Sequence, residues 1–536
     1  MTHRDIKNHL LNRDTVGDVI RRYSKRNPDK LAFVLSPPQG SPIEYTYSKF
    51  NESANRLANG LTACGIKKGE GVAIFSLNTY QLLLTIAVAK IGAYIIPVNP
   101  ALTRNEMEYV IKQSDAKIIF VEDTFADKIL SALPNLLNVK PGFIKFSGKN
   151  EKPDGWIDFE ELISIYPENE PEVEIDSRDM LTLTYTSGTE AFPKGVALMH
   201  QNWLSISIAC QIDSYMGVHE DEVMLESLPL FYTGGMGVGL FPILMGATTV
   251  STYSPDLARM VEMMAKYKTT YTVLTPTIYL RLFHTEGIKE AATSMRKFLT
   301  FGATIPERMI TKGREIAPHI QWVSLYALSE PTCCGAVGLF KTINEIPEGD
   351  LGWVGKPAPS LEMRIVDDNN NDVPVGDVGE LVFRGPVVMK EYYKQPELTA
   401  KVFDSGWFHT GDLGRLNKNG ELFFVDRKKD MIKSGGENIS TASVEYAISS
   451  YPKVSEVAVF GVPHPEWMEA SVAAVIPIQN EYLAEEEIIQ YCKQNLPRFK
   501  VPKYVLIVND FPRNPTGKIL KRELREQYKD IASQGQ

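Results

Sequence analysis

One segment of the chain combines hydroxyl groups, glycines and a lysine in the way that a phosphate-binding loop does. An apolar run, residues 181–185, leads into Thr186, Ser187, Gly188 and Thr189, and Lys194 follows five residues later. Backbone N–H groups, three hydroxyls and one ammonium can together surround a triphosphate. The segment is not a Walker P-loop, because the spacing differs and no Ser or Thr follows the lysine. Taken alone, it is also compatible with a solvated turn.

Six further segments carry chemistry that fits this loop. In chain order they are Pro229-Leu-Phe-Tyr232, Phe301-Gly302-Ala303, Tyr326-Ala-Leu-Ser329-Glu330, Gly406-Trp407-Phe-His-Thr410-Gly411-Asp412, Asp426-Arg427-Lys-Lys429-Asp430 and Pro515-Thr-Gly517-Lys518. Together with the loop they resemble the ordered motifs of the adenylate-forming superfamily, which contains acyl-CoA synthetases, luciferases and the adenylation domains of peptide synthetases. The resemblance extends over nearly the whole chain and is closest to fatty-acid–CoA ligases.

The resemblance implies an ATP site and assigns residues to it. Asp412 and Arg427 are expected to reach the ribose, where a carboxylate can accept hydrogen bonds from both hydroxyls. Glu330 is expected to help hold Mg²⁺, for which one carboxylate suffices when phosphate oxygens complete the coordination. The other residues implied in ATP binding are Thr186, Ser187, Gly188, Thr189, Lys194, Gly302, Ala303, Ser329 and Tyr326, the last beside the adenine.

Lys518 is the predicted catalytic residue. Turn residues 514–517 present it near the C-terminus. Its ammonium can neutralise both the attacking carboxylate and the α-phosphate, whose mutual repulsion is the main obstacle to forming an acyl-adenylate. Outside this motif, a lysine near the end of a chain would be interpreted as a solvated tail residue.

The implied reaction has two halves that need different surroundings. A carboxylate first attacks the α-phosphorus and expels pyrophosphate, and a thiolate then attacks the acyl carbonyl and expels AMP. The resemblance implies that a small C-terminal domain rotates between the halves about Lys429. The rotated domain would present Lys433, Ser434, Gly435 and Gly436 to the pantetheine arm of coenzyme A, the co-substrate.

The segments expected to line the acyl pocket are small or apolar. They contribute Tyr232, Gly234, Gly235, Ala327 and Leu328, none of them carrying a charge at neutral pH. A neutral acyl chain is therefore favoured over a polar acid. Medium- or long-chain fatty acids are the first choice, which places the chain in lipid metabolism, and aryl or aryl-propenoic acids are the second.

Two other functions stay open. An acyl-AMP-forming ligase would deliver its product to a carrier protein, although such relatives usually carry an insertion before the hinge and none is obvious here. A non-catalytic acyl or nucleotide sensor is suggested by Glu190-Ala191, where the family commonly has Thr-Gly, because the change places an acid near a triphosphate. Retention of the predicted ATP-binding and catalytic side chains argues against the sensor.

These residues need a scaffold, and the first four hundred residues alternate apolar β-rich runs with helical patterns. Examples are Val72–Phe75, a helix near 80–90 and Ala93–Val98. This rhythm is typical of an α/β fold in which helices cover parallel sheets. Thr103-Arg-Asn-Glu106 has the form of a capping box, and Ser254-Pro255 is predicted to cap and open a helix that ends at Tyr267.

Later parts of the chain have a different pattern. Hairpin turns at 367–372 and at Asn419-Gly420 indicate a small β-subdomain. Beyond residue 426, the order helix, strand, strand, helix, strand indicates a compact α+β unit. We therefore predict a large N-terminal adenylation domain, residues 1–425, that holds ATP and the acyl group, and a small mobile C-terminal domain, residues 426–536, with its hinge at Lys429 and with Lys518 as its catalytic residue.

Composition limits the remaining classes of protein. The net charge of −9 and the lack of a long basic run disfavour binding to nucleic acid. Five scattered cysteines indicate neither a disulfide framework nor a zinc site, and they favour the reducing cytoplasm. The most hydrophobic window, residues 82–98, contains a lysine, a glycine and a proline, so no transmembrane segment is predicted. Peripheral contact with a membrane and the oligomeric state stay open.

Overall fold

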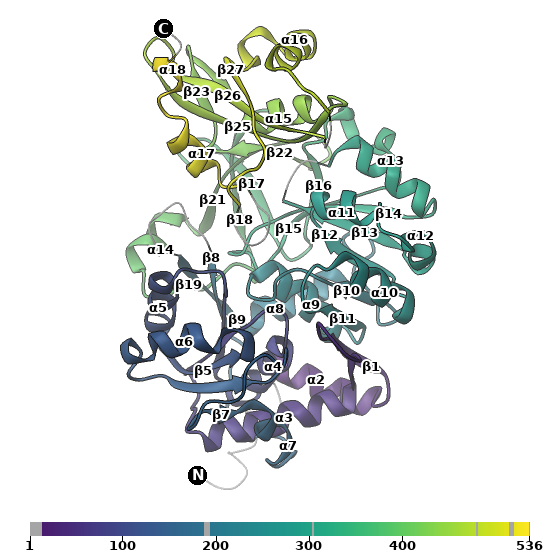
Figure 1. The fold of residues 1–536 in the computed structure, drawn as a ribbon, viewed down its shortest axis with the longest axis vertical. Helices are drawn as coiled ribbons and strands as arrows, with labels where there is room; N and C mark the ends of the chain where they lie inside the picture. Colours follow the sequence, from purple (N-terminus) through teal and green to yellow (C-terminus); the bar gives the residue numbers. More distant parts are fainter. Residues whose placement is uncertain (1–12, 187–192, 303–304, 479–480, 514–518, 535–536) are drawn as a thin grey trace.

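The computed structural model describes residues 13–186, 193–302, 305–478, 481–513 and 519–534. Figure 1 shows a large body that contains the N-terminal and central parts of the chain, and a smaller unit at one end, coloured yellow-green, that contains the C-terminal part. Backbone hydrogen bonds among the described residues form three sheets. Two of these sheets lie in the body and the third lies in the C-terminal unit.

The first sheet is mainly parallel and is covered on both faces. Its strands, in order across the sheet, are β19 (Glu391–Tyr392), β9 (Lys194–Met199), β8 (Met180–Thr186), β4 (Tyr94–Val98), β3 (Gly71–Phe75), β5 (Ala116–Glu122), β6 (Lys140–Ile144) and β7 (Ile157–Asp158). Alternate residues of β3 enter two different cores. Val72 and Ile74 pack in one core with α3 (Tyr47–Ala63) and α4 (Gln81–Ile91). Ala73 and Phe75 pack in the other with α5 (Arg104–Gln113) and α6 (Ala126–Ala132). This arrangement is the one expected for a parallel sheet between helical layers.

The second sheet changes from parallel to antiparallel pairing along its width. Its order is β2 (Ile43–Thr46), β1 (Leu31–Ser36), β11 (Thr248–Thr252), β10 (Val223–Glu226), β12 (Tyr271–Leu274), β13 (Lys297–Phe301), β14 (Gln321–Ala327), β15 (Gly335–Phe340), β16 (Trp353–Pro357), β22 (Leu422–Arg427), β21 (Trp407–Leu416), β18 (Gly379–Arg384) and β17 (Glu362–Val366), with β20 (Phe403–Asp404) on β21. Pairing is parallel from β1 to β14 and antiparallel beyond it. The predicted hairpin strands therefore form the antiparallel end of this sheet.

Helices complete the body around these sheets. They are α2 (Val16–Arg26), α7 (Phe159–Ser164), α8 (His200–Cys210), α9 (Thr233–Leu244), α10 (Leu257–Tyr267), α11 (Pro276–Leu282), α12 (Ile288–Ala291), α13 (Glu307–Ile316) and α14 (Pro396–Val402). The apolar window that the sequence shows near residue 82 is the wholly buried helix α4, followed by β4. No helix in the described part of the chain has the length and apolar character needed to cross a membrane.

Local capping signals explain where two helices begin. The capping box of α5 is confirmed, because Thr103 accepts from the backbone N–H of Glu106 and the Glu106 carboxylate accepts from that of Thr103 at 2.8 Å. The prediction for α10 was wrong at its start. The helix begins at Leu257, and the carboxylate of Asp256, rather than the Ser254 hydroxyl, accepts from the backbone N–H of Arg259 at 2.8 Å. A charged acceptor at the positive end of the helix makes the stronger cap.

The C-terminal unit has its own sheet and its own two cores. The sheet order is β24 (Glu437–Ile439), β23 (Ile432–Ser434), β26 (Met468–Pro477) and β25 (Val454–His464), with β27 (Tyr504–Ile507) on β26. The helices are α15 (Thr441–Ser449), α16 (Glu485–Asn495), α17 (Lys521–Gln527) and α18 (Ile531–Gln534). Every residue in these cores lies beyond residue 431. The division between 425 and 426 stays a prediction, and β22 continues two residues past it.

Candidate active site

The two described ends of the predicted phosphate segment lie side by side. β8 ends at Thr186, β9 begins at Lys194, and the antiparallel register pairs these two residues directly. β8 is parallel to β4, so Thr186 lies at the carboxyl edge of the first sheet, where ligands bind in α/β folds. The predicted residues between them, Ser187, Gly188 and Thr189, fall outside the described residues, together with Glu190 and Ala191.

Lys194 and Glu330 meet at a third side chain, Tyr392. The Tyr392 hydroxyl donates a hydrogen bond to Glu330 Oε1 at 2.7 Å, and Lys194 Nζ lies 5.6 Å from the centre of the tyrosine ring. Glu330 follows β14 of the second sheet, whereas Lys194 and Tyr392 lie on neighbouring strands of the first. The structure thus brings the predicted metal-binding carboxylate and the predicted phosphate-binding ammonium together across the two sheets.

Asp412, Tyr326 and Arg427 form a second cluster. Asp412 and Arg427 are register partners on β21 and β22, with Arg427 Nε 3.9 Å from Asp412 Oδ1. The Tyr326 hydroxyl donates to Asp412 Oδ2 at 2.7 Å, and the tyrosine ring stacks on Phe424 at 5.8 Å. Burial and the Asp412 charge hold the pKa of Tyr326 well above its usual value. The hydroxyl therefore keeps its proton and orients the carboxylate.

The backbone between these clusters is held in unusual conformations. Gly302 follows β13 with φ +82°, which favours glycine, and Ala303 lies outside the described residues. Ser329 and Glu330 precede Thr332 and Cys333, whose φ values are +54° and +59°. The Thr332 hydroxyl donates to the Val387 carbonyl at 2.6 Å and anchors this turn. Such strain persists where the surroundings fix the backbone, as they do at functional sites.

Residues predicted for the acyl pocket gather where α9 meets the turn after β14. Tyr232 precedes α9, accepts a hydrogen bond from Asn99 Nδ2 at 3.2 Å, and has a pKa raised to about 12 by burial. Gly235 lies so close to Pro229 that a Cβ would stand 2.2 Å from its carbonyl oxygen. Gly234 faces open space. Farther along α9, a Cβ on Gly237 would lie 3.5 Å from the Cys333 sulfur.

The same turn holds the remaining predicted acyl residues. Ala327 ends β14 and Leu328 follows it, and the Leu328 carbonyl accepts from the backbone N–H of Cys333 at 2.9 Å. The contact between Cys333 and α9 therefore places Ala327 and Leu328 beside the helix that carries Gly234 and Gly235. The approach of Cys333 to Gly237 is the observation that connects the two groups of predicted residues.

The residues predicted for coenzyme A lie elsewhere in this structure. Lys433 and Ser434 are on β23, and Gly435 and Gly436 form the turn into β24 with φ values of +59° and +87°. Figure 1 shows β23 in the C-terminal unit, far from β8 and β9 in the body. Lys518 lies outside the described residues; on either side of its segment, Arg513 and Ile519 pair as an antiparallel bridge.

Lys429 lies in the connection between the body and the C-terminal unit. The turn is closed by a hydrogen bond from the Asp430 N–H to the Arg427 carbonyl at 2.9 Å. Desolvation and the charge of Arg427 lower the pKa of Lys429. On one side Lys428 pairs with Asp368 at 2.8 Å in the body, and on the other Asp430 pairs with Arg525 at 2.9 Å in α17.

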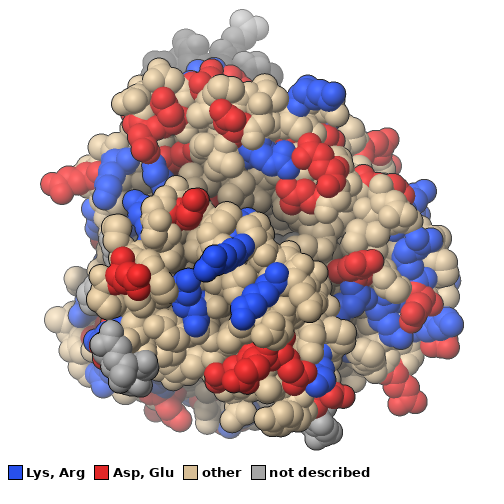
Figure 2. All heavy atoms as spheres, turned by 90° about the horizontal axis from the view of Figure 1, so that it is seen from above, with Lys and Arg blue, Asp and Glu red and all other residues tan. Residues whose placement is uncertain are grey.

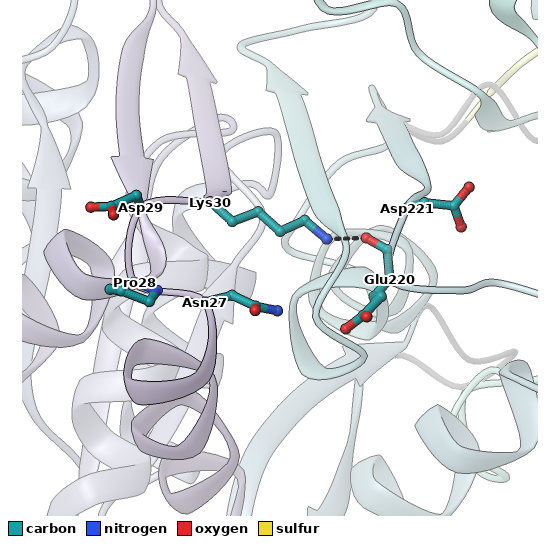
Figure 3. A pocket seen from close by; sticks show the side chains of 6 residues that line it. All are labelled: Asn27, Pro28, Asp29, Lys30, Glu220 and Asp221. Carbon is teal, nitrogen blue, oxygen red and sulfur yellow. Dashed lines mark hydrogen bonds between the residues drawn. The ribbon is translucent and has the colours of Figure 1, made fainter.

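Two other surface features do not resemble a nucleotide site. The hollow in Figure 3 is lined by Asn27, Pro28, Asp29, Lys30, Glu220 and Asp221, and its ammonium already donates to backbone carbonyls of Glu220 and Gly246. Its three carboxylates would repel phosphate. On the face in Figure 2, Lys and Arg are interspersed with Asp and Glu, so this face offers no continuous basic surface to a nucleic-acid backbone.

Tyr392 is a residue in contact with two predicted site residues, and sequence reasoning did not identify it. A single tyrosine on a short strand has the same sequence appearance as a core aromatic, and Tyr392 is 6% exposed. Its contacts with Glu330 and Lys194 distinguish it from a core aromatic. The signal that could have found it is its position in the segment that returns to pair with β9, immediately beside the lysine strand.

Comparison with known proteins assigns the chain to a family. Residues 20–393 match the AMP-binding enzyme family, and residues 443–518 match the AMP-binding enzyme C-terminal domain. The chain belongs to the AMP-binding enzyme family. This AMP-binding enzyme is 33% identical to long-chain-fatty-acid–CoA ligase FadD13 of Mycobacterium tuberculosis over 518 residues, which is 96% of this chain and 98% of the relative.

Two further comparisons agree. The enzyme is 31% identical to feruloyl-CoA synthase of Amycolatopsis sp, over 90% of this chain and 94% of the relative. Its fold is similar to the crystal structure of ATP-bound MatB from Rhodopseudomonas palustris, with a TM-score of 0.84 and 27% identity over 97% of this chain and all of that one. The AMP-binding enzyme is therefore an AMP-forming acid–thiol ligase, an acyl- or aryl-CoA synthetase that uses ATP, Mg²⁺ and coenzyme A.

Proposed function

We propose that this ligase activates a medium- or long-chain fatty acid as its acyl-adenylate and transfers the acyl group to coenzyme A. One observation carries the choice of acid. α9, from Thr233 to Leu244, contains no ionisable side chain and borders the turn that carries Leu328 and Glu330. A carboxylate can thus approach the nucleotide cluster while an apolar tail meets an uncharged wall. The similarity to FadD13 supports the same choice.

Each of the two clusters would bind a different part of ATP. Asp412 and Arg427 would bind the ribose hydroxyls, with Tyr326 and the backbone at Gly302 and Ala303 beside the adenine. The phosphates would lie against Thr186 and Lys194 together with Ser187, Gly188 and Thr189, and the turn at Ser329 would support the carboxylate that follows it. We expect these positions to surround one space between the two sheets.

Glu330 fits the role of the protein ligand to Mg²⁺. The described residues contain no group of three or more His, Cys, Asp or Glu side chains that could hold a metal by themselves. A half-buried carboxylate such as Glu330 fits an ion whose other ligands are phosphate and water oxygens. When bound, the ion would reduce the negative charge that the attacking carboxylate meets.

The C-terminal unit would supply a different face for each half-reaction. In the first half, the Lys518 ammonium would neutralise the approaching carboxylate and the α-phosphate. A rotation about Lys429 would then bring Lys433, Ser434, Gly435 and Gly436 toward the body. In this structure Lys433 and the two glycines are exposed, so they are available to a pantetheine arm once the unit has turned.

An aryl acid is the second candidate substrate. The similarity to feruloyl-CoA synthase favours it, and so does the aromatic pair Phe231 and Tyr232, whose ring centres lie 4.9 Å apart at the start of α9. A flat aryl group would stack on such a pair, whereas a flexible chain would extend along the glycines of α9. The two substrates therefore use different parts of the same wall.

Pyrophosphate release with a panel of acids, with and without coenzyme A, tests the proposal. We expect release with fatty acids of medium and long chain, and acyl-CoA only when coenzyme A is present. Exclusive turnover of aryl acids would overturn the fatty-acid assignment. Adenylate formation without thioester would indicate a carrier-protein acceptor, and ATP binding without any release would indicate a sensor. The five free cysteines support the reducing cytoplasm as the place of this reaction.

A further inference from the structure

We propose that Tyr392 is a positioning residue that fixes the metal-binding carboxylate of Glu330 relative to the phosphate-binding ammonium of Lys194. The inference rests on the proposed roles of these two residues in holding Mg²⁺ and ATP. Tyr392 itself touches neither the acid nor the reacting phosphorus in this assignment. It acts through the two charged side chains that it contacts.

The two contacts use different parts of the tyrosine. Its hydroxyl donates to Glu330 Oε1 at 2.7 Å, a short bond to a charged acceptor. The centre of its ring lies 5.6 Å from Lys194 Nζ, within the range of a cation–π interaction. The ring holds the cation and the hydroxyl holds the anion, so one rigid side chain with two rotatable bonds sets the geometry of both.

The backbone fixes the tyrosine in turn. Tyr392 pairs with Val196 on β9, two residues after Lys194, and its N–H donates to the Thr399 hydroxyl at 3.1 Å. The neighbouring Met389 N–H donates to the Glu330 carbonyl at 2.7 Å. The segment 389–392 therefore contacts Glu330 through backbone and side chain, and it joins the turn after β14 to the strand that carries the lysine.

This arrangement has a consequence for metal binding. A carboxylate that serves as a protein ligand to Mg²⁺ binds the ion better when it already points at the phosphates, because Mg²⁺ requires near-ideal octahedral geometry. A hydrogen bond to one oxygen holds the carboxylate in one rotamer and leaves the second oxygen for the ion. Tyr392 would therefore strengthen the Mg²⁺-dependent part of ATP binding more than the Mg²⁺-independent part.

The test uses three variants of the full chain. Tyr392→Phe removes the hydroxyl and keeps the ring, and Tyr392→Leu removes both. Tyr393→Phe is the matched control, because the Tyr393 hydroxyl donates to Asp115 at 2.9 Å and contacts neither charged residue of the site. Calorimetric titration with ATP, in the presence of excess Mg²⁺ and in the presence of a chelator, separates the two parts of the affinity.

We expect Tyr392→Phe to reduce the gain in ATP affinity that Mg²⁺ provides by about ten-fold, the effect of one hydrogen bond to a charged group. Affinity without Mg²⁺ should stay unchanged in this variant and fall in Tyr392→Leu. In a Glu330→Gln background, Tyr392→Phe should have no further effect on the Mg²⁺-dependent gain. Tyr393→Phe should match the wild type.

Two results would overturn the inference. One is an unchanged Mg²⁺-dependent gain in Tyr392→Phe, and the other is an equal loss with and without Mg²⁺. The unfolding midpoints of all variants show whether a loss of ATP affinity reflects a loss of folding. If it does, the effect of Tyr392→Phe in the Glu330→Gln background decides whether Tyr392 acts through Glu330. A wild-type chain that binds no ATP would overturn the proposed function, whereas wild-type binding that ignores Tyr392 would overturn only this step.

Discussion

The hydrogen bond from Tyr326 to Asp412 shows how a buried aromatic residue orients a buried carboxylate. Asp412 is 5% exposed and Tyr326 is 8% exposed, so both groups have lost most of their contact with water. A buried carboxylate without partners would be costly. The hydroxyl reduces this cost, fixes the direction of the carboxylate and leaves its other oxygen toward Arg427.

Tyr326→Phe tests this arrangement at single-residue resolution. The variant keeps the ring that stacks on Phe424 and removes only the donor, so we expect the KM for ATP to rise about ten-fold, as for the loss of one hydrogen bond to a charged group. Steady-state kinetics with saturating acid and coenzyme A measures it. Tyr451→Phe, which removes a hydroxyl bonded to Glu487 at 2.9 Å in the C-terminal unit, serves as the control.

Lys518→Ala should separate the two half-reactions. Without the ammonium, the negative charges of the carboxylate and the α-phosphate are not neutralised as they approach. We therefore expect adenylate formation to fall by about 10²–10³-fold, the usual effect of removing one group that stabilises transition-state charge. Conversion of supplied acyl-AMP to acyl-CoA should remain near the wild-type rate. Pyrophosphate release and thioester formation are measured separately, and equal losses in both would contradict the role.

Residue-level prediction from the sequence had a clear limit. Asp412, Arg427 and Tyr326 were predicted together, and the structure places them in contact, because Asp412 on β21 pairs with Arg427 on β22 and accepts a hydrogen bond from Tyr326 on β14. Tyr392 was not predicted, since its importance depends on a contact with Glu330 that no local pattern encodes. The predictions for Ser187, Gly188, Thr189, Ala303 and Lys518 stay predictions.

At the scale of single elements, α9 illustrates how glycine allows close approach. Its Gly235 lies against the carbonyl of Pro229, and the neighbouring Gly234 faces open space. Two adjacent positions on one helix therefore have opposite steric requirements, although both are glycine in the sequence.

Gly235→Ala and Gly234→Ala form a matched pair. A methyl group at 235 would meet the carbonyl oxygen at 2.2 Å and force the loop away from α9, so we expect a loss of about 1–3 kcal/mol in the free energy of unfolding, typical of overpacking. At 234 the change should leave stability unchanged or slightly higher. Chemical denaturation measures both. Equal destabilisation by the two changes would show that the helix, rather than the contact, decides the outcome.

Gly234→Ala also tests the acyl wall. If the open space beside Gly234 holds the substrate, the added methyl should shift the preference toward shorter fatty acids. The ratio of kcat/KM for a long and a medium chain measures the shift. An unchanged ratio would mean that the acyl chain runs along another part of α9.

Elements were predictable where their signals are local. The capping box of α5 and the turn between β21 and β22 depend on neighbouring residues, and both are confirmed. The start of α10 was misplaced, because a serine before a proline resembles a cap. Asp256, the residue after the proline, is the better acceptor. The order of strands in the second sheet could not be read, since it joins segments hundreds of residues apart.

At the scale of the whole molecule, the connection at Lys429 is anchored separately on each side. Lys428 pairs with residues of the body and Asp430 pairs with α17 of the C-terminal unit. A rotation at the residue between them would break neither pair. By contrast, Arg308 of α13 donates to the carbonyls of Val454 and Ser455, both at 2.9 Å, and these bonds would break when the unit turns.

Lys429→Pro should hold the enzyme in one arrangement. Proline fixes φ near −65° and removes the backbone N–H, so the residue can no longer absorb a large change in backbone angle. We expect pyrophosphate release in a single turnover to persist and acyl-CoA formation to fall at least about ten-fold, because the second arrangement becomes inaccessible. Rapid-quench measurement of both products checks this. An undiminished overall rate would remove the argument for rotation.

The pairing of β21 with β22 joins the predicted ribose-binding residues to the predicted hinge. Arg427 is the last residue of β22, opposite Asp412, and the predicted hinge residue Lys429 lies two residues beyond it. A sugar bound between these side chains would hold the end of β22, the strand that leads into the C-terminal unit. Release of AMP would then remove this restraint on the hinge as well as empty the nucleotide site. Each catalytic cycle would therefore return the enzyme to its starting state through the loss of its own by-product.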